Sequence, residues 1–281
     1  MPDDELLSVS RAAEYANVPK TLLENGEEVS QQVRGRRRYY SKVALDEWIE
    51  TRKRRTIDLG KEDYAKCFDF ALAMYYRGYT AVDWGTSRKR EAGQSITNWV
   101  RGQLGEIAVQ KFLQRDFRKE VELDFDLHDE IVPQDIIGVR ERGVMKQPRI
   151  KIGIKATKFK NSFLILSAAD VEPENRKSDA YILTRINLPD DHLLRISKPE
   201  LEKLLVNERH FSTYKNKLSN FEPVPCEVVG FVYIRELNRE DDPARLAKIL
   251  GTRSVSGYRY IMAAGKMHNS TEDWQVLANS L

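Results

Sequence analysis

The chain has 281 residues, enough for one large domain or for a small domain followed by a medium one. Hydrophobic residues make up 41% of the sequence, which is enough for a hydrophobic core. Charged residues make up 32%, and this balance argues against a disordered chain. The net charge of +3 identifies no partner, no apolar stretch is as long as a membrane span, and the first residues lack the pattern of a signal peptide, so we expect a cytoplasmic protein.

Basic residues are unevenly distributed along the chain. Five lie between Arg34 and Lys42 with no acid among them, and eight lie between Arg140 and Lys160 against one acid. Such clusters can neutralise phosphates, although a single basic run is also typical of a solvated surface. Because two such clusters lie inside recognisable elements, the interpretation as a solvated surface is weakened.

Residues 6–55 predict a compact unit of three short helices and a hairpin. The break at Asn17-Val18-Pro19 separates two helical stretches, and residues 33–40 predict a tight basic hairpin. Ser41 can cap a third helix, whose apolar residues recur at helical spacing.

Three short motifs in this unit follow a known order: Val9-Ser10-Arg11-Ala12-Ala13, Gly35-Arg36-Arg37-Arg38-Tyr39 and Ala44-Leu45-Asp46-Glu47-Trp48. The order resembles the winged helix-turn-helix of excisionases and MerR-like regulators. The resemblance implies a DNA-binding domain over residues 1–56, with the second helix in a major groove. The DNA contacts it implies are Lys20 and Thr21 on that helix and Arg36, Arg37 and Arg38 on the wing. The alternative is a small structural or protein-binding domain, because Glu24, Glu27 and Glu28 oppose the approach of phosphates.

Residues 57–96 predict a helical linker that leads into the main domain. Thr97 to Leu113 then predicts a helix with Gly105-Glu106 near its middle. A glycine inside a helix costs about 1 kcal/mol relative to alanine, which indicates that Gly105 permits a close backbone approach. Taken alone, Glu106 would be an ordinary surface glutamate.

Three strands are predicted after this helix, over residues 121–127, 135–139 and 150–155. Asp135 lies at the head of the second strand and Lys155 in the third. Phosphodiester hydrolysis uses such a pair, since carboxylates hold Mg²⁺ and a lysine orients the attacking water or stabilises charge.

The helix with Gly-Glu, the strand headed by Asp and the strand with Lys resemble the PD-(D/E)xK nuclease superfamily, which includes type II restriction endonucleases. The resemblance covers about residues 97–185. It implies that Asp135 is the first acid, Lys155 the motif lysine and Glu106 the helix glutamate. Asp135 and Glu106 are then the expected Mg²⁺ ligands.

Gly153 departs from this pattern, because the family has a second acid there. Strand alternation puts Gly153 on the same face as Lys155, where a carboxylate would point at the same metal. Three interpretations stay open. The ligand has migrated to Glu106, or to Asp124 or Asp126; the domain binds nucleic acid without cutting it; or the glycine is an introduced substitution.

The sequence therefore predicts an α/β protein: a PD-(D/E)xK-like mixed-sheet core flanked by helices over residues 97–281, preceded by a small winged helix-turn-helix domain. We expect an Mg²⁺-dependent, sequence-specific endonuclease of the restriction type that hydrolyses phosphodiester bonds of double-stranded DNA. It is expected to act as a homodimer, with Lys158 as a further DNA contact. The alternatives are a non-catalytic DNA-binding regulator, an inactive nuclease fold that binds DNA, and a basic hairpin in an unrelated α/β domain. Residues 190–281 carry no catalytic motif and are expected to extend the core sheet.

Overall fold

The computed structural model describes residues 5–78, 91–128, 134–174, 177–250, 252, 255 and 257–281. The strands are β1 (Leu6–Ser8), β2 (Gln31–Arg34), β3 (Arg37–Ser41), β4 (Thr56–Leu59), β5 (Val121–Leu123), β6 (Ile136–Glu141), β7 (Val144–Lys146), β8 (Ile152–Lys158), β9 (Phe163–Ser167), β10 (Ala180–Ile186), β11 (Val224–Tyr233), β12 (Asn238–Glu240) and β13 (Arg259–Ala263). The α-helices are α1 (Val9–Tyr15), α2 (Lys20–Gly26), α3 (Lys42–Arg54), α4 (Lys61–Tyr76), α5 (Ala92–Phe117), α6 (Ala168–Val171), α7 (His192–Leu204), α8 (Phe211–Tyr214), α9 (Pro243–Leu250) and α10 (Thr271–Ser280). The short 3₁₀ helices are η2 (Lys215–Lys217), η3 (Ile234–Glu236) and η4 (Ala264–Lys266). Within these ranges no helix is both long enough and apolar enough to cross a membrane.

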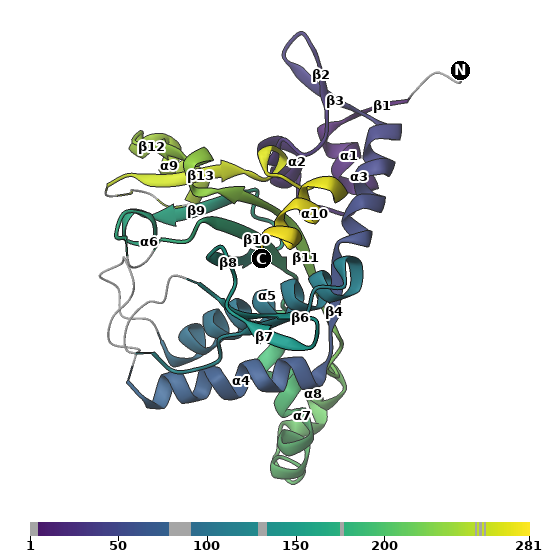
Figure 1. Ribbon diagram of the computed structural model, residues 1–281. Coiled ribbons are helices and arrows are strands. Elements are labelled where there is room, and N and C mark those ends of the chain that lie inside the picture. Colours follow the sequence, from purple (N-terminus) through teal and green to yellow (C-terminus); the bar gives the residue numbers. More distant parts are fainter. Residues whose placement is uncertain are drawn as a thin grey trace.

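The N-terminal unit contains the three helices and the basic hairpin that the sequence predicts. Its sheet has the order β1-β3-β2, and the β2–β3 hairpin projects away from the rest of the molecule (Figure 1). Gly35 takes a φ of +62° at the hairpin turn, a value that favours glycine. The Ser41 hydroxyl accepts a hydrogen bond from the Ala44 amide at 3.2 Å, which confirms the predicted cap of α3.

The central sheet of the core has the strand order β4-β11-β10-β8. β8 runs parallel to β10, whereas the other two pairings are antiparallel. The segment expected as a helical linker therefore begins with a strand, since β4 pairs with β11 from Thr56 to Leu59. β8 lies at one edge of this sheet and carries Lys155.

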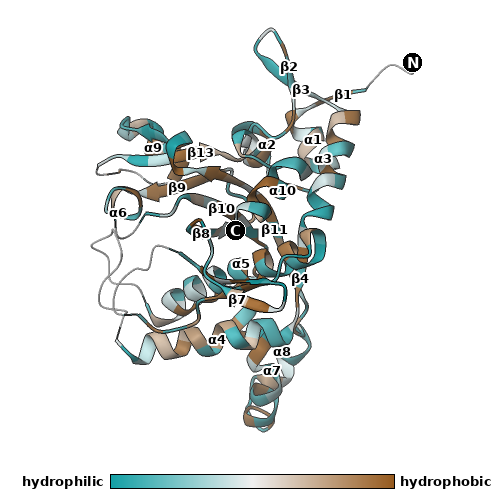
Figure 2. Cartoon of the chain, viewed as in Figure 1, coloured by the Kyte–Doolittle hydropathy of each residue, from teal (hydrophilic) through white to brown (hydrophobic). Residues whose placement is uncertain are grey.

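Each face of the central sheet is covered by a different layer. On one face α5 packs in the main core cluster with Ile152, Ile154 and Ile182. On the other face Tyr181 and Leu183 pack in a second cluster with residues of β9 and β13. Figure 2 shows the apolar strands lying between these layers.

The C-terminal residues divide between the two sheets. β11 extends the central sheet as expected, but β13 pairs with β9 and β12 in a separate sheet of order β12-β13-β9. The expectation that all C-terminal strands extend one sheet is therefore wrong for β13. The physical reason is the apolar outer face of β10 and β11, which needs a covering layer.

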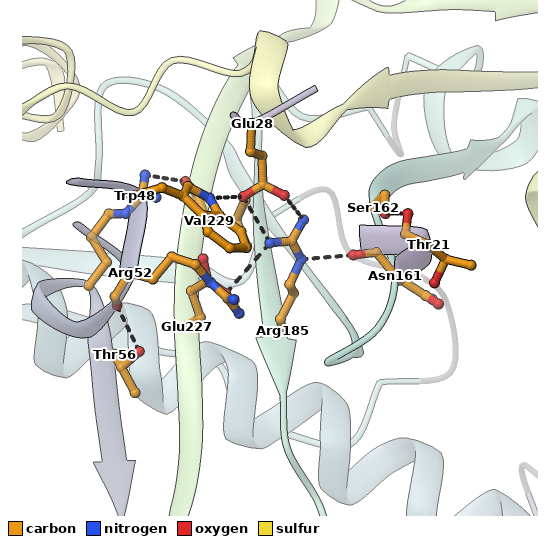
Figure 3. A network of polar contacts seen from close by, with 11 residues as sticks. Thr21, Glu28, Trp48, Arg52, Thr56, Asn161, Ser162, Arg185, Glu227 and Val229 are labelled. Carbon is orange, nitrogen blue, oxygen red and sulfur yellow. Dashed lines mark hydrogen bonds and ion pairs between the residues drawn. The ribbon is translucent and has the colours of Figure 1, made fainter. Parts of the chain in front are cut away.

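A buried charge network joins the N-terminal unit to the central sheet (Figure 3). The Arg185 guanidinium, on β10, is fully buried and donates to the Glu28 carboxylate at 2.6 and 3.0 Å. Arg52 of α3 donates to Glu227 of β11 at 2.7 and 3.0 Å. A Cβ placed on Gly265 would lie 2.0 Å from the Glu27 carbonyl oxygen, so the backbones also pack closely at this seam. These contacts fix the N-terminal unit against the core.

Candidate active site

Glu106 is buried because α5 lies directly against the central sheet. A Cβ on Gly105 would lie 2.5 Å from the Thr184 hydroxyl and 2.8 Å from the Ala156 Cβ, which confirms the close approach predicted for this glycine. Glu106 is only 7% exposed as a result, unlike an ordinary surface glutamate. Gln103, one turn earlier, donates through Nε2 to Glu106 Oε1 at 3.0 Å. The Gln103 amide oxygen is buried without a hydrogen-bond partner.

Asp135 directly precedes β6 and lies beside β8. Its amide donates to the Ile152 carbonyl at 2.9 Å, and its carboxylate accepts a hydrogen bond from the Ile154 amide. On its other side, the Asp124 amide donates to the Asp135 carbonyl at 3.1 Å. The backbone of β8 therefore fixes the position of the Asp135 carboxylate.

The two expected metal ligands influence each other electrostatically. Burial raises the pKa of Glu106 well above its usual range, and the nearby charges of Asp135 and Asp124 raise it further. Burial also raises the pKa of Asp135, although the Lys155 charge and the Ile154 amide oppose the rise. Lys155 likewise opposes the rise at Glu106. The fold thus brings Glu106, Asp135 and Lys155 into one electrostatic neighbourhood.

Lys155 projects from the face of β8 that looks toward β9 and α6. In the parallel pairing of β8 with β10, Gly153 is opposite Tyr181 and Lys155 is opposite Leu183. Tyr181 and Leu183 both belong to the second core cluster, so the expected shared face of Gly153 and Lys155 is confirmed. α5 packs on the opposite face, and Asp135 lies beside β8 through its hydrogen bonds with Ile152 and Ile154.

Asp170 is the acid that faces Lys155, and sequence reasoning missed it. The Lys155 ammonium lies 3.4 Å from the Asp170 carboxylate. The same carboxylate accepts hydrogen bonds from the Ser167 amide at 3.0 Å and from the Ser167 hydroxyl at 2.6 Å. A Ser-x-x-Asp capping pattern directly after an apolar strand is the signal that could have placed this acid at the sheet.

The lysine and this acid hold each other in their charged forms. Burial acts to lower the pKa of Lys155, but the charges of Asp170 and Asp135 outweigh it and raise that pKa. Burial acts to raise the pKa of Asp170, but Lys155 and the two Ser167 hydrogen bonds leave it lowered. Lys155 is therefore positively charged at neutral pH. Its side chain is 37% exposed.

Close packing accounts for the glycine at position 153. A Cβ there would lie 2.6 Å from the Ser178 hydroxyl and 3.0 Å from the Tyr181 ring. The Tyr181 hydroxyl in turn donates to the Asp170 carbonyl at 2.9 Å. A side chain at position 153 would require the Ser178 hydroxyl and the Tyr181 ring to shift, so a carboxylate is not accommodated there without rearrangement.

The alternative acids on the preceding segment differ in their placement. Asp124 has a side chain that is 10% exposed, and it forms a 2.7 Å contact with the His128 imidazole. It raises the pKa values of Glu106 and Asp135 and so belongs to the same neighbourhood. Asp126 is exposed, and its amide donates a hydrogen bond to the Asp124 carboxylate at 3.0 Å.

The expected DNA contacts of the N-terminal unit are accessible, and one of its three acids is withdrawn from the surface. Lys20, Thr21 and the wing arginines are exposed, as is Lys158 at the end of β8. Glu28 is buried against Arg185, whereas Glu27 lies 3.3 Å from Lys266 with 49% of its side chain exposed, and Glu24 is exposed. Docking thus removes only part of the negative charge that opposes the approach of phosphates.

Within the described part of the chain, no group of three or more His, Cys, Asp or Glu side chains is arranged to hold a metal ion. Glu106 and Asp135 are two buried carboxylates in one electrostatic neighbourhood, and Gln103, which donates to Glu106 through Nε2, has an amide oxygen that is buried without a hydrogen-bond partner. No protein family model, curated protein or solved structure matches the chain.

Proposed function

We propose that the protein is an Mg²⁺-dependent endonuclease that hydrolyses phosphodiester bonds of double-stranded DNA, with Glu106, Asp135 and Lys155 at its catalytic site. The observation that carries the proposal is two buried carboxylates with raised pKa values beside a lysine that stays charged. Strongly perturbed groups of opposite kinds in one neighbourhood are typical of catalytic sites. The PD-(D/E)xK resemblance remains part of the proposal.

The oxygen atoms present are suited to Mg²⁺. Glu106 and Asp135 supply hard carboxylate oxygens, and the Gln103 amide oxygen is a buried acceptor that lacks a donor. Mg²⁺ commonly takes one or two protein carboxylates and keeps several waters, so a third acid is not required. When bound, the ion would supply the positive charge that activates water and neutralises the phosphate.

Lys155 contributes a fixed positive charge and does not act as a general base. Because Asp170 and Asp135 raise its pKa, it holds its proton at neutral pH and donates it in hydrogen bonds. A charged donor beside the scissile phosphate stabilises the negative charge that develops in the transition state. Asp170 holds the ammonium in place and acts as a positioning residue, with Ser167 holding Asp170 in turn.

The direct test is incubation of the full-length protein with plasmid DNA and Mg²⁺ or Mn²⁺. We expect discrete fragments from the wild type and loss of cutting in Lys155→Ala. Lys151→Ala is the matched control, since Lys151 is an exposed lysine four positions earlier in the chain. Absence of cleavage on modified and unmodified duplexes with either metal would contradict the proposal.

A second candidate function is a DNA-binding protein that does not cut. It is favoured by the lack of a three-ligand group in the described ranges and by the packed Gly153. It predicts that the wild type binds duplex DNA and leaves the plasmid intact. The cleavage experiment therefore separates the two candidates.

We propose a homodimer as the active form, because cutting both strands of a duplex requires two sites. Sedimentation of the protein with and without DNA tests this point. A monomer on DNA that nicks only one strand would overturn the dimer and leave the nuclease chemistry in place.

A further inference from the structure

A groove of about 390 Å³ lies between the N-terminal unit and the core. One wall is α2, which contributes Thr21 and Asn25. The facing wall is the turn from β8 to β9, with residues 160–163, and the last residues of α9, including Lys248, close one side. The groove thus combines an element of the DNA-reading unit with the strand that carries Lys155.

Buried contacts hold the two walls at a fixed separation. The Ser162 hydroxyl donates to the Thr21 carbonyl at 3.1 Å, directly joining the turn to α2. The Arg185 guanidinium donates to the Asn161 carbonyl at 2.7 Å and to the Glu28 carboxylate, so one buried residue contacts both walls (Figure 3). The groove is therefore preformed and does not depend on a ligand to assemble it.

These contacts place one side of α2 against the core. A recognition helix needs an open face on which the duplex can close. Here the α2 backbone is hydrogen-bonded to Ser162, and Glu28 just after the helix is buried against Arg185. The exposed side chains of α2 are Lys20, Thr21, Glu24 and Asn25, and two of them, Thr21 and Asn25, line the groove.

The lining of the groove is complementary to phosphate. It carries two lysines, Lys160 and Lys248, and no acidic side chain among the described residues. Among the described residues, neither lysine has an ion-pair partner, and the side chains of Thr21 and Asn25 have no hydrogen-bond partner. Two cations and two polar side chains are thus available for a ligand with several acceptor oxygens.

The position of the groove relative to Lys155 suits a DNA strand. Lys160 is five residues after Lys155 in the sequence. At about 3.3 Å per residue, the Cα atoms of the two lysines are at most about 17 Å apart. One strand of B-DNA advances about 3.4 Å per nucleotide. A strand seated in the groove therefore reaches Lys155 within about five nucleotides.

We propose that this groove binds the sugar–phosphate backbone of the DNA strand whose scissile phosphate lies at Lys155. The inference rests on the proposed function and specifies how the N-terminal unit serves it. Lys160 and Lys248 neutralise phosphates, and Thr21 and Asn25 hydrogen-bond to them. α2 therefore acts by positioning the backbone against the core, while the wing remains the element free to reach a DNA groove.

The test measures the salt dependence of DNA binding by the full chain, using a short duplex with Ca²⁺ in place of Mg²⁺ to prevent cutting. Each phosphate contact contributes about 0.9 to the slope of log affinity against log salt. We expect Lys160→Gln and Lys248→Gln each to reduce the slope by about 0.9, and the double variant by about 1.8. Lys217→Gln, an exposed lysine on η2 outside the groove, is the matched control and should leave the slope unchanged.

A second variant tests the groove without removing a lysine. Asn25→Glu places a carboxylate at the wall and should weaken binding through repulsion of phosphate. Unchanged slopes in both lysine variants, together with wild-type affinity in Asn25→Glu, would overturn the groove proposal and leave the nuclease proposal standing. A wild-type protein that binds no DNA would overturn both, whereas a protein that binds through the groove but never cuts would overturn the nuclease proposal alone.

Discussion

Two clusters of buried acids in this protein have opposite electrostatic character. At the seam, burial acts to raise the pKa of Glu227, but the charges of Arg185 and Arg52 outweigh it and leave the pKa lowered. At the candidate site, burial raises the pKa of Glu106 well above its usual range, and neighbouring carboxylates raise it further. Both acids are almost inaccessible, at 2% and 7% exposure.

The difference between the clusters is the supply of positive charge. Glu227 contacts two guanidinium groups, at 2.7 Å and 3.5 Å. Glu106 receives one amide hydrogen bond from Gln103 and only partial compensation from Lys155. A fold retains an uncompensated buried acid at a cost in stability, and binding of a cation would offset that cost. The first cluster is thus expected to serve docking and the second to serve chemistry.

The largest expected effect is on cleavage. Asp135→Asn should reduce the rate of plasmid cutting by at least about 100-fold, because a metal ion contributes several kcal/mol of charge stabilisation. Asp126→Asn, an exposed acid on the preceding segment, should cut normally. Equal rates of plasmid cutting for the two variants would show that Asp135 does not belong to the catalytic site.

The next effect is on the stability of the seam. Glu227→Gln leaves Arg52 without its charged partner and should lower the free energy of unfolding by about 3 kcal/mol. Since the pKa of Glu227 is lowered, its contribution is present above the unfolded pKa and lost as pH falls through the folded pKa. Denaturant unfolding at neutral pH checks the loss, and an unchanged midpoint would show that the network does not stabilise the docked state.

The corresponding substitution at the candidate site, Glu106→Gln, should change the free energy of unfolding in the opposite direction. The pKa of Glu106 is raised, so the metal-free protein loses stability as pH rises from the unfolded pKa of about 4.3 through the folded value. Glu106→Gln should therefore stabilise the metal-free protein at about pH 8 more than at about pH 4, because the neutral amide avoids the cost of a buried charge. Thermal unfolding in a chelator measures this effect, and destabilisation would contradict the comparison.

A smaller effect concerns a buried histidine outside both clusters. Burial lowers the pKa of His192 to about 4, and its ring nitrogens contact the Tyr64 hydroxyl at 2.5 Å and the Thr97 hydroxyl at 3.0 Å. Its contribution to stability is present above the unfolded pKa of about 6.5 and is lost as pH falls toward 4. His192→Asn should flatten the stability profile in that window, and an unaltered profile would show that another group controls it.

The sequence predicted the elements with strong local signals. The three N-terminal helices, the hairpin at Gly35 and the acid before β6 depend on caps, turns and alternation, which a short stretch encodes. The close approach at Gly105 was also predictable from the sequence, because a glycine inside a helix lowers helix stability and therefore indicates a packing requirement.

The missed residues depend on contacts that are distant in sequence. Arg185 and Glu28 are separated by 157 positions, so no local pattern links them. Asp170 reaches Lys155 only because α6 folds back over β8, and Glu106 is buried only because α5 crosses Ala156 and Thr184. The separate sheet of β13 similarly follows from the need to cover β10 and β11.

The central claim is that Glu106 is a buried acid kept for a metal ion, and cleavage by Glu106→Gln tests it most directly. Plasmid cutting with Mg²⁺ is compared between the wild type and this variant, with DNA affinity in Ca²⁺ measured in parallel. We predict that the wild type cuts and that Glu106→Gln loses at least about 100-fold in rate while it binds DNA as well as the wild type. Cleavage by Glu106→Gln at the wild-type rate would contradict the account.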